Sequence, residues 1–341
     1  MQKTDLKSLT KDALALFIKD TGLPAFRSRQ ILHWIYERSV QSIEEITELS
    51  KKLREELSER AYISNLALLD RQTSEDGTEK FLFGLEDGET IESVLIPDED
   101  RLTLCISSQV GCAMGCVFCL TGKLGLKRNL YAHEIVDQVI SVSRLIFPRR
   151  ITNIVLMGMG EPLANFDNVV EALGRITGWM KISPKRVTLS TSGIVPKIAE
   201  LGRKGPKVNL AISLNATTDA VRDRIMPINK THPIKAVLEA CRKFPLPPAR
   251  RITFEYVMLK DINDSIADAK RLIGLLHGIP AKVNLIPFNP YGGCEYARSD
   301  DANVLRFQEI LADANLTVII RKSKGQDILA ACGQLKARYG E

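Results

Sequence analysis

The chain has 341 residues, 45% of them hydrophobic and 26% charged, a composition typical of a globular enzyme with room for one α/β barrel and an accessory segment. Its net charge of +6 is compatible with a polyanionic partner but does not by itself indicate one. No stretch approaches 18 uninterrupted apolar residues and the first residues lack a signal-peptide core, so we expect no membrane partner and a cytoplasmic protein.

Residues 1–62 have the pattern of short helices, written LTKDALALFIKDTG, FRSRQILHWIYERS and IEEITELSKKLREELSER. In the second segment Ile31, Leu32 and Ile35 recur at helical spacing. The pattern predicts a helical accessory domain. Its basic and aromatic residues could form an RNA-binding surface or belong to a solvated helical bundle with Trp34 in its core: Lys7, Lys11, Arg27, Arg29, Trp34 and Tyr36.

Residues 63–100 change to short runs of alternating polarity, such as KFLFGLEDG and ETIESVLIPDED. The turn sequences EDG and PDED separate these runs. Such a pattern is typical of small antiparallel hairpins, so we expect a β-hairpin connector here.

From residue 101 to 341 predicted strands alternate with predicted helices. The strands are LTLCIS, NIVLMG, RVTLST, KVNLAIS, RITFEYVML, KVNLIPF and LTVIIR. Six or seven strand–helix units indicate an α/β fold with a parallel sheet, which we expect to form a partial (β/α)6-type barrel. An open doubly wound sheet has the same periodicity and remains an alternative. In both folds ligands bind at the carboxyl ends of the strands.

The stretch GCAMGCVFCLTG, residues 111–122, directly follows the first of these strands and holds Cys112, Cys116 and Cys119. An odd total of seven cysteines argues against a disulfide framework. A [4Fe–4S] cluster bound by three thiolates keeps one iron open for a further ligand. The alternative, structural zinc, needs a fourth ligand, for which Cys105 or His133 are candidates.

The CxxxCxxC spacing, with Phe118 before the last cysteine, resembles the radical S-adenosylmethionine (SAM) superfamily. Further segments narrow the resemblance to the RlmN/Cfr family of RNA methyltransferases, and most closely to its RlmN members. These segments are GMGEP (158–162), STSG (190–193), ISLNA (212–216), RITFEYVML (251–259), VNLIPFNP (283–290) and RKSKGQDILAACGQL (321–335).

The resemblance implies a [4Fe–4S] cluster on Cys112, Cys116 and Cys119, with SAM on the open iron. It also implies a set of SAM contacts in the segments that follow the strands: Gly160, Glu161, Ser192, Ser213, Leu214, Asn215 and Asn289. From the residues alone, Glu161 could equally cap the helix that follows it, and Asn289 could form an ordinary Asn-Pro turn.

Three further residues match catalytic positions of the family. Cys332 would accept a methyl group from one SAM and carry it, while a second SAM in each turnover supplies a radical. Cys105 would resolve the covalent intermediate, leaving a Cys105–Cys332 disulfide for an external thiol to reduce. Glu92 matches the proton acceptor. A lone cysteine is otherwise most often a buried apolar residue, and Glu92 could be an exposed strand acid.

The activity implied is methylation of C2 of an adenosine in the peptidyl transferase centre of 23S rRNA and of the adenosine beside the tRNA anticodon. Rival interpretations are C8 methylation as in Cfr, a radical enzyme for peptides or small molecules, and a zinc-stabilised RNA-binding protein. We expect a monomer served by an electron donor such as flavodoxin. Basic residues in two loops are candidates for phosphate contacts: Lys123, Lys127, Arg128, Arg321, Lys322 and Lys324.

Overall fold

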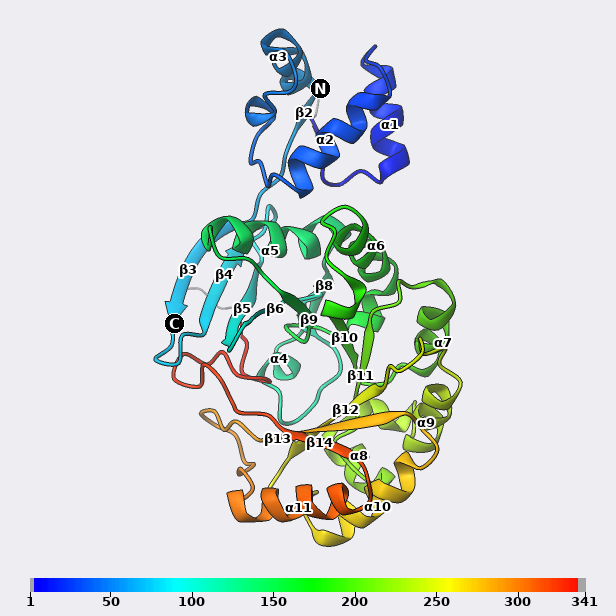
Figure 1. Cartoon of the computed structure of the whole chain (residues 1–341). Helices are drawn as coiled ribbons and strands as arrows, with labels where there is room; N and C mark the ends of the chain where they lie inside the picture. The colour runs from blue at the N-terminus through cyan, green and yellow to red at the C-terminus, as the bar shows by residue number, and fades with distance from the viewer. Residues whose placement is uncertain (1–2, 337–341) are drawn as a thin grey trace.

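The computed structural model, which describes residues 3–336, is built around one sheet of ten strands (Figure 1). Seven neighbouring strands are parallel: β6 (Arg101–Cys105), β9 (Asn153–Leu156), β10 (Val187–Thr191), β11 (Asn209–Ser213), β12 (Ile252–Met258), β13 (Ala281–Pro287) and β14 (Thr317–Ile320). All seven strands predicted after residue 100 are present. Apolar residues predominate in the central strands, such as Leu210 and Ile212 of β11, because helices and the barrel interior cover the two faces of this part of the sheet.

Helices connect the parallel strands and cover the outside of the sheet (Figure 1). They are α5 (Ala132–Leu145), α6 (Phe166–Gly178), α7 (Val195–Lys204), α8 (Asp219–Ile225), α9 (Ile234–Arg242), α10 (Ile266–Leu276) and α11 (Asp301–Asp313), with short 3-10 turns η2 (Pro162–Asn165), η3 (Pro184–Arg186) and η4 (Pro227–Lys230). In α5 the residues Ile135, Val139 and Val142 are fully buried, as their spacing predicts. No helix within residues 3–336 is both long and apolar enough to span a bilayer.

The sheet curls into a partial barrel, which confirms the predicted fold class. Its two edge strands, β14 and β3, are not paired with each other in the part of the chain that the structure describes. The tail after β14 crosses this open side and reaches the turn between β3 and β4 (Figure 1). There Ser74 Oγ donates to Asp327 (2.6 Å) and the N–H of Gly325 donates to Asp76 (2.9 Å).

The predicted hairpins of residues 63–100 form part of the barrel sheet. β3 (Ala67–Thr73), β4 (Glu79–Gly84) and β5 (Thr90–Asp98) are antiparallel, and β5 pairs with β6 through Val94 opposite Cys105. The hairpins are therefore more than a connector, because backbone pairing continues from β5 into the barrel strand β6. This continuity places the side chains of β4 and β5 beside Cys105.

The N-terminal segment is helical, as expected. It contains β1 (Thr4–Asp5), α1 (Lys11–Asp20), α2 (Phe26–Tyr36), η1 (Ile43–Glu45), α3 (Lys51–Arg60) and β2 (Ala61–Tyr62). Thr10 caps α1 by accepting the N–H of Ala13, and Ser50 caps α3 in the same way through Leu53. Leu14 and Ile18 of α1 are fully buried.

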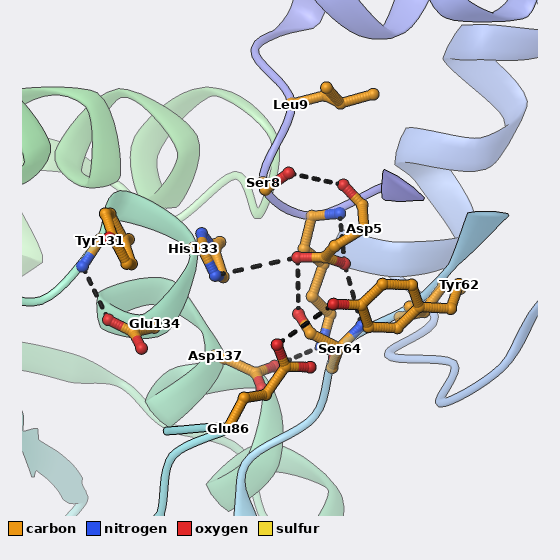
Figure 2. A network of polar contacts seen from close by, with 12 residues as sticks. Asp5, Ser8, Leu9, Tyr62, Ser64, Glu86, Tyr131, His133, Glu134 and Asp137 are labelled. Carbon is orange, nitrogen blue, oxygen red and sulfur yellow. Dashed lines mark hydrogen bonds and ion pairs between the residues drawn. The ribbon is translucent and has the colours of Figure 1, made fainter. Parts of the chain in front are cut away.

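A buried polar network joins this segment to α5 of the barrel (Figure 2). Lys7 Nζ lies 2.5 Å from Asp137 Oδ1, and both side chains are almost fully buried. Asp5 accepts hydrogen bonds from Ser64, and His133 Nε2 lies 3.8 Å from Asp5 Oδ2.

The network corrects two members of the proposed RNA surface. Lys7 is 1% exposed and Tyr36 is 3% exposed, because both face the barrel and not the solvent. Tyr36 accepts a hydrogen bond from Arg175 of α6 (3.1 Å). Trp34 is partly buried and donates to Glu48 (2.9 Å). The helical-bundle alternative therefore describes these residues better.

Candidate functional site

A cavity lies inside the curve of the sheet, at the carboxyl ends of the parallel strands. The walls come from the ends of β9 to β13, from the loop after β7 (Gln109–Cys112) and from the C-terminal tail. The structure brings ten of the predicted site residues to these walls: Cys112, Cys116, Cys119, Gly160, Glu161, Ser192, Ser213, Asn215, Asn289 and Cys332. The ends of parallel strands meet at one edge, so residues far apart in the sequence share one cavity.

The three-cysteine loop runs from β7 into α4 (Leu120–Lys123), and β8 (Gly125–Asn129) then returns alongside β7. Cys112 is buried, while Cys116 and Cys119 are partly buried. Burial raises the pKa of Cys112 to about 12, and burial followed by repulsion from the other two thiolates raises the pKa of Cys116. A bound metal would reverse this effect, because a coordinating thiol is deprotonated.

The arrangement fits a cluster better than a single zinc ion. Within residues 3–336 no three His, Cys, Asp or Glu side chains converge on one metal-ion position. The three thiols all line one cavity, which suits a [4Fe–4S] cluster with one iron for each thiol. Of the proposed fourth zinc ligands, His133 is beside Asp5 at the domain junction, and Cys105 lines only the second cavity, which Cys119 but neither Cys112 nor Cys116 also lines.

The GMGEP segment follows β9. Gly160 has φ +101°, and a Cβ atom there would lie 2.6 Å from a side chain of β7, so the close approach requires glycine. The buried carboxylate of Glu161 accepts hydrogen bonds from Thr191 Oγ1 (2.6 Å), the N–H of Ser192 (2.7 Å) and the N–H of Leu163 (2.9 Å). Burial raises its pKa. Glu161 therefore caps η2, as one interpretation predicted, and also faces the cavity.

Hydroxyl and amide side chains follow the next strands. Ser192 Oγ is buried and has no hydrogen-bond partner among residues 3–336. Asn215 adopts φ +56°, and its Oδ1 accepts the N–H of Val257 (2.8 Å). Asn289 Oδ1 accepts a hydrogen bond from the tail residue Gln326 (3.0 Å). Buried polar atoms without a partner are uncommon, so Ser192 Oγ suits a polar ligand in this cavity.

Leu214 is the one predicted SAM contact that does not line the cavity. Its side chain is fully buried, and its carbonyl accepts a hydrogen bond from Arg222 Nε (3.0 Å). Arg222, which is also fully buried, donates to the carbonyls of Ser192 (2.7 Å) and Ser213 (3.1 Å). Arg222 was not identified from the sequence, although its hydrogen bonds join the ends of β10 and β11, where Ser192 and Ser213 are located.

The tail holds Cys332 beside the three-cysteine loop. The N–H of Leu120 donates to the carbonyl of Gly333 (2.7 Å), and Thr121 Oγ1 donates to the carbonyl of Leu335 (2.6 Å). Cys332 itself is exposed and lines the cavity described above. Two hydrogen bonds from the start of α4 thus hold the tail directly after Cys332 and place this residue beside the three-cysteine loop.

Cys105, at the end of β6, lines a second cavity that it shares with Cys332 and Arg321. Burial, followed by the nearby Cys332, raises the pKa of Cys105 to about 12. All seven cysteines of the chain are free thiols. The structure therefore does not contain the disulfide that the resemblance implied.

Glu92 lies on β5, is buried, and does not line either cavity. Its Oε1 is 3.3 Å from Lys80 Nζ, and its Oε2 accepts the N–H of Lys336 (2.9 Å). The alternative of an exposed strand acid is wrong, because the tail covers this face of the sheet. Lys80 could not be selected from the sequence, since it is one of many lysines on short polar runs.

Arg321 was predicted as a phosphate-binding residue of a loop, but its guanidinium lines both cavities. Electrostatic interaction with the nearby Cys332, which outweighs the opposing effect of burial, raises the pKa of Arg321. Glu255, in the middle of β12, lines the first cavity and was not singled out either. A charged residue between Phe254 and Tyr256 in an apolar strand was the available signal.

The basic residues after the cysteine loop are already engaged with the protein. Arg128 forms ion pairs with Asp87 (2.6 Å) and Glu134 (2.8 Å), and Lys127 lies 3.5 Å from Glu89. The charges of Arg128 and Lys127 are therefore already paired within the protein, without an RNA phosphate. Lys322 is exposed and, with Lys324, lines the second cavity.

Comparison with known proteins agrees with this geometry. The radical SAM superfamily matches residues 106–273, and the ribosomal RNA large subunit methyltransferase N-terminal domain matches residues 4–63. The chain is 56% identical to the dual-specificity RNA methyltransferase RlmN of Pelobacter propionicus over 99% of this chain and 97% of that one. It is 54% identical to the RlmN of Geotalea uraniireducens, covering 99% and 98%.

A crystal structure of a radical SAM methyltransferase from Sphaerobacter thermophilus superimposes with a TM-score of 0.94 at 41% identity. The match covers 98% of this chain and all of that one. Similarity therefore extends over the helical N-terminal segment, the barrel and the tail together. The chain belongs to the RlmN family of radical SAM RNA methyltransferases.

Proposed function

We propose that this enzyme methylates C2 of an adenosine in 23S rRNA and of the adenosine beside the tRNA anticodon. The observation that carries the proposal is the convergence of Cys332, Cys105 and the three-cysteine loop at two adjoining cavities. The names of its relatives, dual-specificity RNA methyltransferases, support two RNA substrates. Carbon C2 of adenine is electron-poor and does not attack the methyl group of SAM directly. A thiol that carries the methyl group and a second thiol that releases the product would therefore both be needed, and Cys332 and Cys105 lie beyond the loop in suitable places.

The three cysteines of the loop would hold a [4Fe–4S] cluster, and the polar strand ends would hold SAM. Together these groups supply a methyl group and a carbon radical, for which we propose two SAM molecules in each turnover. Ser192 Oγ, Glu161 and Asn289 present acceptors and donors to the same cavity. These side chains orient the cofactor and exclude water from it.

Cys332 would carry the methyl group, because a thiolate is a good nucleophile and this one is exposed at the cavity. The carrier becomes bonded to the adenine C2 and must be released. After the C2 proton leaves to Glu92, the one unpaired electron of the adduct would have to return to the cluster. Cys105 Sγ would then attack Cys332 Sγ: the S–S bond forms as the bond between Cys332 Sγ and the methylene carbon breaks, and that carbon keeps the electron pair and takes up a proton to become the C2 methyl group. An external dithiol would reduce the transient Cys105–Cys332 disulfide and restore both thiols.

RNA would approach from the side of the tail, where Lys322 and Lys324 line the second cavity. The adenine must leave its stack to reach Cys332, so an unpaired or loop adenosine suits the site. We propose a cytoplasmic enzyme supplied with electrons by a small redox protein such as flavodoxin.

The test is anaerobic reconstitution with iron and sulfide, followed by turnover with SAM, a low-potential reductant, a dithiol and transcribed fragments of 23S rRNA and tRNA. Nucleoside mass spectrometry against synthetic standards should find 2-methyladenosine from both RNAs. Finding 8-methyladenosine would assign the C8 reaction instead. Methylation that persists in Cys332→Ala would contradict the methyl-carrier role.

A further inference from the structure

Glu255 is the buried acid of the main cavity that the proposed reaction leaves without a role. It lies in the middle of β12, is 4% exposed, and lines the cavity. Its Oε1 accepts a hydrogen bond from Asn284 Nδ2 (3.0 Å). Its Oε2 is buried and has no hydrogen-bond partner within residues 3–336. A carboxylate with one oxygen held and the other unpaired is suited to a donor from a ligand.

The strand register explains how Glu255 is positioned. Ser213 of β11 lies opposite Glu255, and Asn284 of β13 lies opposite it on the other side. Side chains in register on neighbouring strands point to the same face of a sheet, so these three form one polar row. Ser213 and Glu255 both line the cavity. Asn284 fixes the carboxylate in the row without using its second oxygen.

The next side chains toward the carboxyl ends of β12 and β13 are apolar, whereas Asn215 follows Ser213 on the β11 side. Val257 lies two residues beyond Glu255 on β12, and Ile286 two residues beyond Asn284 on β13, and both line the cavity. An acceptor carboxylate beside a serine hydroxyl is complementary to the vicinal hydroxyls of a ribose. An apolar row next to it is complementary to the flat face of a base. The two rows together therefore match a nucleoside.

We propose that Glu255 accepts a hydrogen bond from a ribose hydroxyl of SAM, and that Asn284 is the positioning residue that holds the carboxylate for it. This inference rests on the proposed function, because it assumes that SAM occupies the cavity. Burial raises the pKa of Glu255, and attraction to Arg321, which lines the same cavity, opposes this effect and favours the carboxylate.

The test measures binding and not turnover. Equilibrium dialysis would be performed anaerobically on reconstituted protein with the cluster oxidised, so that SAM remains intact. The probes are SAM, its 2′-deoxy analogue and its 3′-deoxy analogue. Wild-type protein should bind one of the two analogues about 10-fold or more weakly than SAM, the range expected for a hydrogen bond to a charged group. Glu255→Gln should bind SAM more weakly and lose most of this discrimination.

Glu134→Gln is the matched control, since Glu134 is also buried but pairs with Arg128 outside the cavity. It should bind and discriminate like the wild type. Asn284→Ala keeps the Glu255 carboxylate but removes its hydrogen-bond donor, so this variant should lose part of the discrimination between SAM and its deoxy analogue. It also provides a test if Glu255→Gln does not fold. Equal affinity of the wild type for all three ligands, or undiminished discrimination in Glu255→Gln, would overturn the inference and leave the proposed function standing. A wild-type protein that binds no SAM would overturn both.

Discussion

The side chain of Lys80 lies 3.3 Å from Glu92, and both are largely buried on one face of the antiparallel strands. On this face, Lys80 of β4 lies opposite Val94 of β5, and Leu82 lies opposite Glu92. Val94 in turn lies opposite Cys105 of β6. The ion pair is therefore next to the thiol proposed to resolve the intermediate. Removing one member of a buried pair leaves an uncompensated charge.

Lys80→Met should slow release of methylated RNA by at least about 10-fold, because a buried carboxyl group without its counter-ion favours the protonated form, which cannot accept the C2 proton. The methyl-carrier step does not use Glu92, so Cys332 should still become methylated. The variant should therefore accumulate protein–RNA adduct, measured on denaturing gels with labelled RNA. Lys80→Arg keeps the charge and should accumulate much less. Normal release by Lys80→Met would show that Glu92 does not depend on Lys80.

The two thiols outside the loop should differ in reactivity. The pKa of Cys105 is raised to about 12, so below that pH its thiolate fraction, and its rate of alkylation by iodoacetamide, should rise about 10-fold for each pH unit. Exposed Cys332 should be labelled first at pH 7.5. Mass spectrometry of the reconstituted protein after timed labelling gives both rates.

Cys241 is the internal control for this experiment. Burial also raises its pKa to about 12, but it lies on α9 and lines neither of the two site cavities. Cys105, which lines a cavity, should therefore be labelled faster than Cys241 at every pH. Equal labelling of Cys105 and Cys332 at pH 7.5 would contradict the burial of Cys105.

Much of the fold could be predicted from the sequence because strand and helix periodicities are local properties. The strands β9, β10 and β13, which precede the GMGEP segment, Ser192 and Asn289, were recognisable by their apolar runs, whereas β7 and β8 around the three-cysteine motif were not predicted. The pairing of the hairpins with β6 was not, since pairing between distant segments leaves no trace in local periodicity. The path of the tail across the open side of the barrel was equally hidden.

The site divides in the same way. The cysteines at fixed spacing and the polar residues directly after strands could be recognised from the sequence, and most of these residues line the cavity. Lys80, Glu255 and Arg222 were missed because their importance depends on what lies opposite them in neighbouring strands or loops. Lys7 was assigned to the surface because a lysine is rarely buried unless it is paired, and its partner Asp137 is far away in the sequence.

Gly333 should be essential for placing Cys332. It adopts φ +85°, and a Cβ atom there would lie 3.1 Å from the carbonyl oxygen of Phe118 in the cysteine loop. Gly333→Ala should push the tail away from the loop and lower the rate of RNA methylation by about 10-fold or more, since small misplacements of reacting groups are costly. Gly88→Ala is a matched control, because Gly88 has the same φ of +85° and open space around it.

Both substitutions carry a similar backbone penalty of about 1 kcal/mol, so their stabilities should be close. Only Gly333→Ala should lose activity. Thermal unfolding and the rate of 2-methyladenosine formation separate the two effects. Equal activity of both variants would mean that the loop and the tail adjust to the extra methyl group without moving Cys332.

The buried pair between Lys7 and Asp137 should dominate the attachment of the helical segment to the barrel. Lys7→Met removes the ammonium and leaves Asp137 with the N–H of Leu66 (2.8 Å) as its remaining donor. Breaking a buried pair in this way costs about 3–5 kcal/mol, whereas an exposed pair contributes about 1 kcal/mol or less. Denaturant unfolding should therefore show a large loss for Lys7→Met and a small one for Lys181→Met, whose partner is Glu37 at the surface.

The double variant Lys7→Met with Asp137→Asn gives the decisive comparison. Asparagine removes the uncompensated charge and can still accept the N–H of Leu66, so the double variant should be more stable than Lys7→Met alone. Comparable losses for Lys7→Met and Lys181→Met would mean that apolar packing, and not the buried pair, attaches the two parts. If the pair does attach them, limited proteolysis of Lys7→Met should cut first near residues 63–66, where the chain passes from the helices to β3.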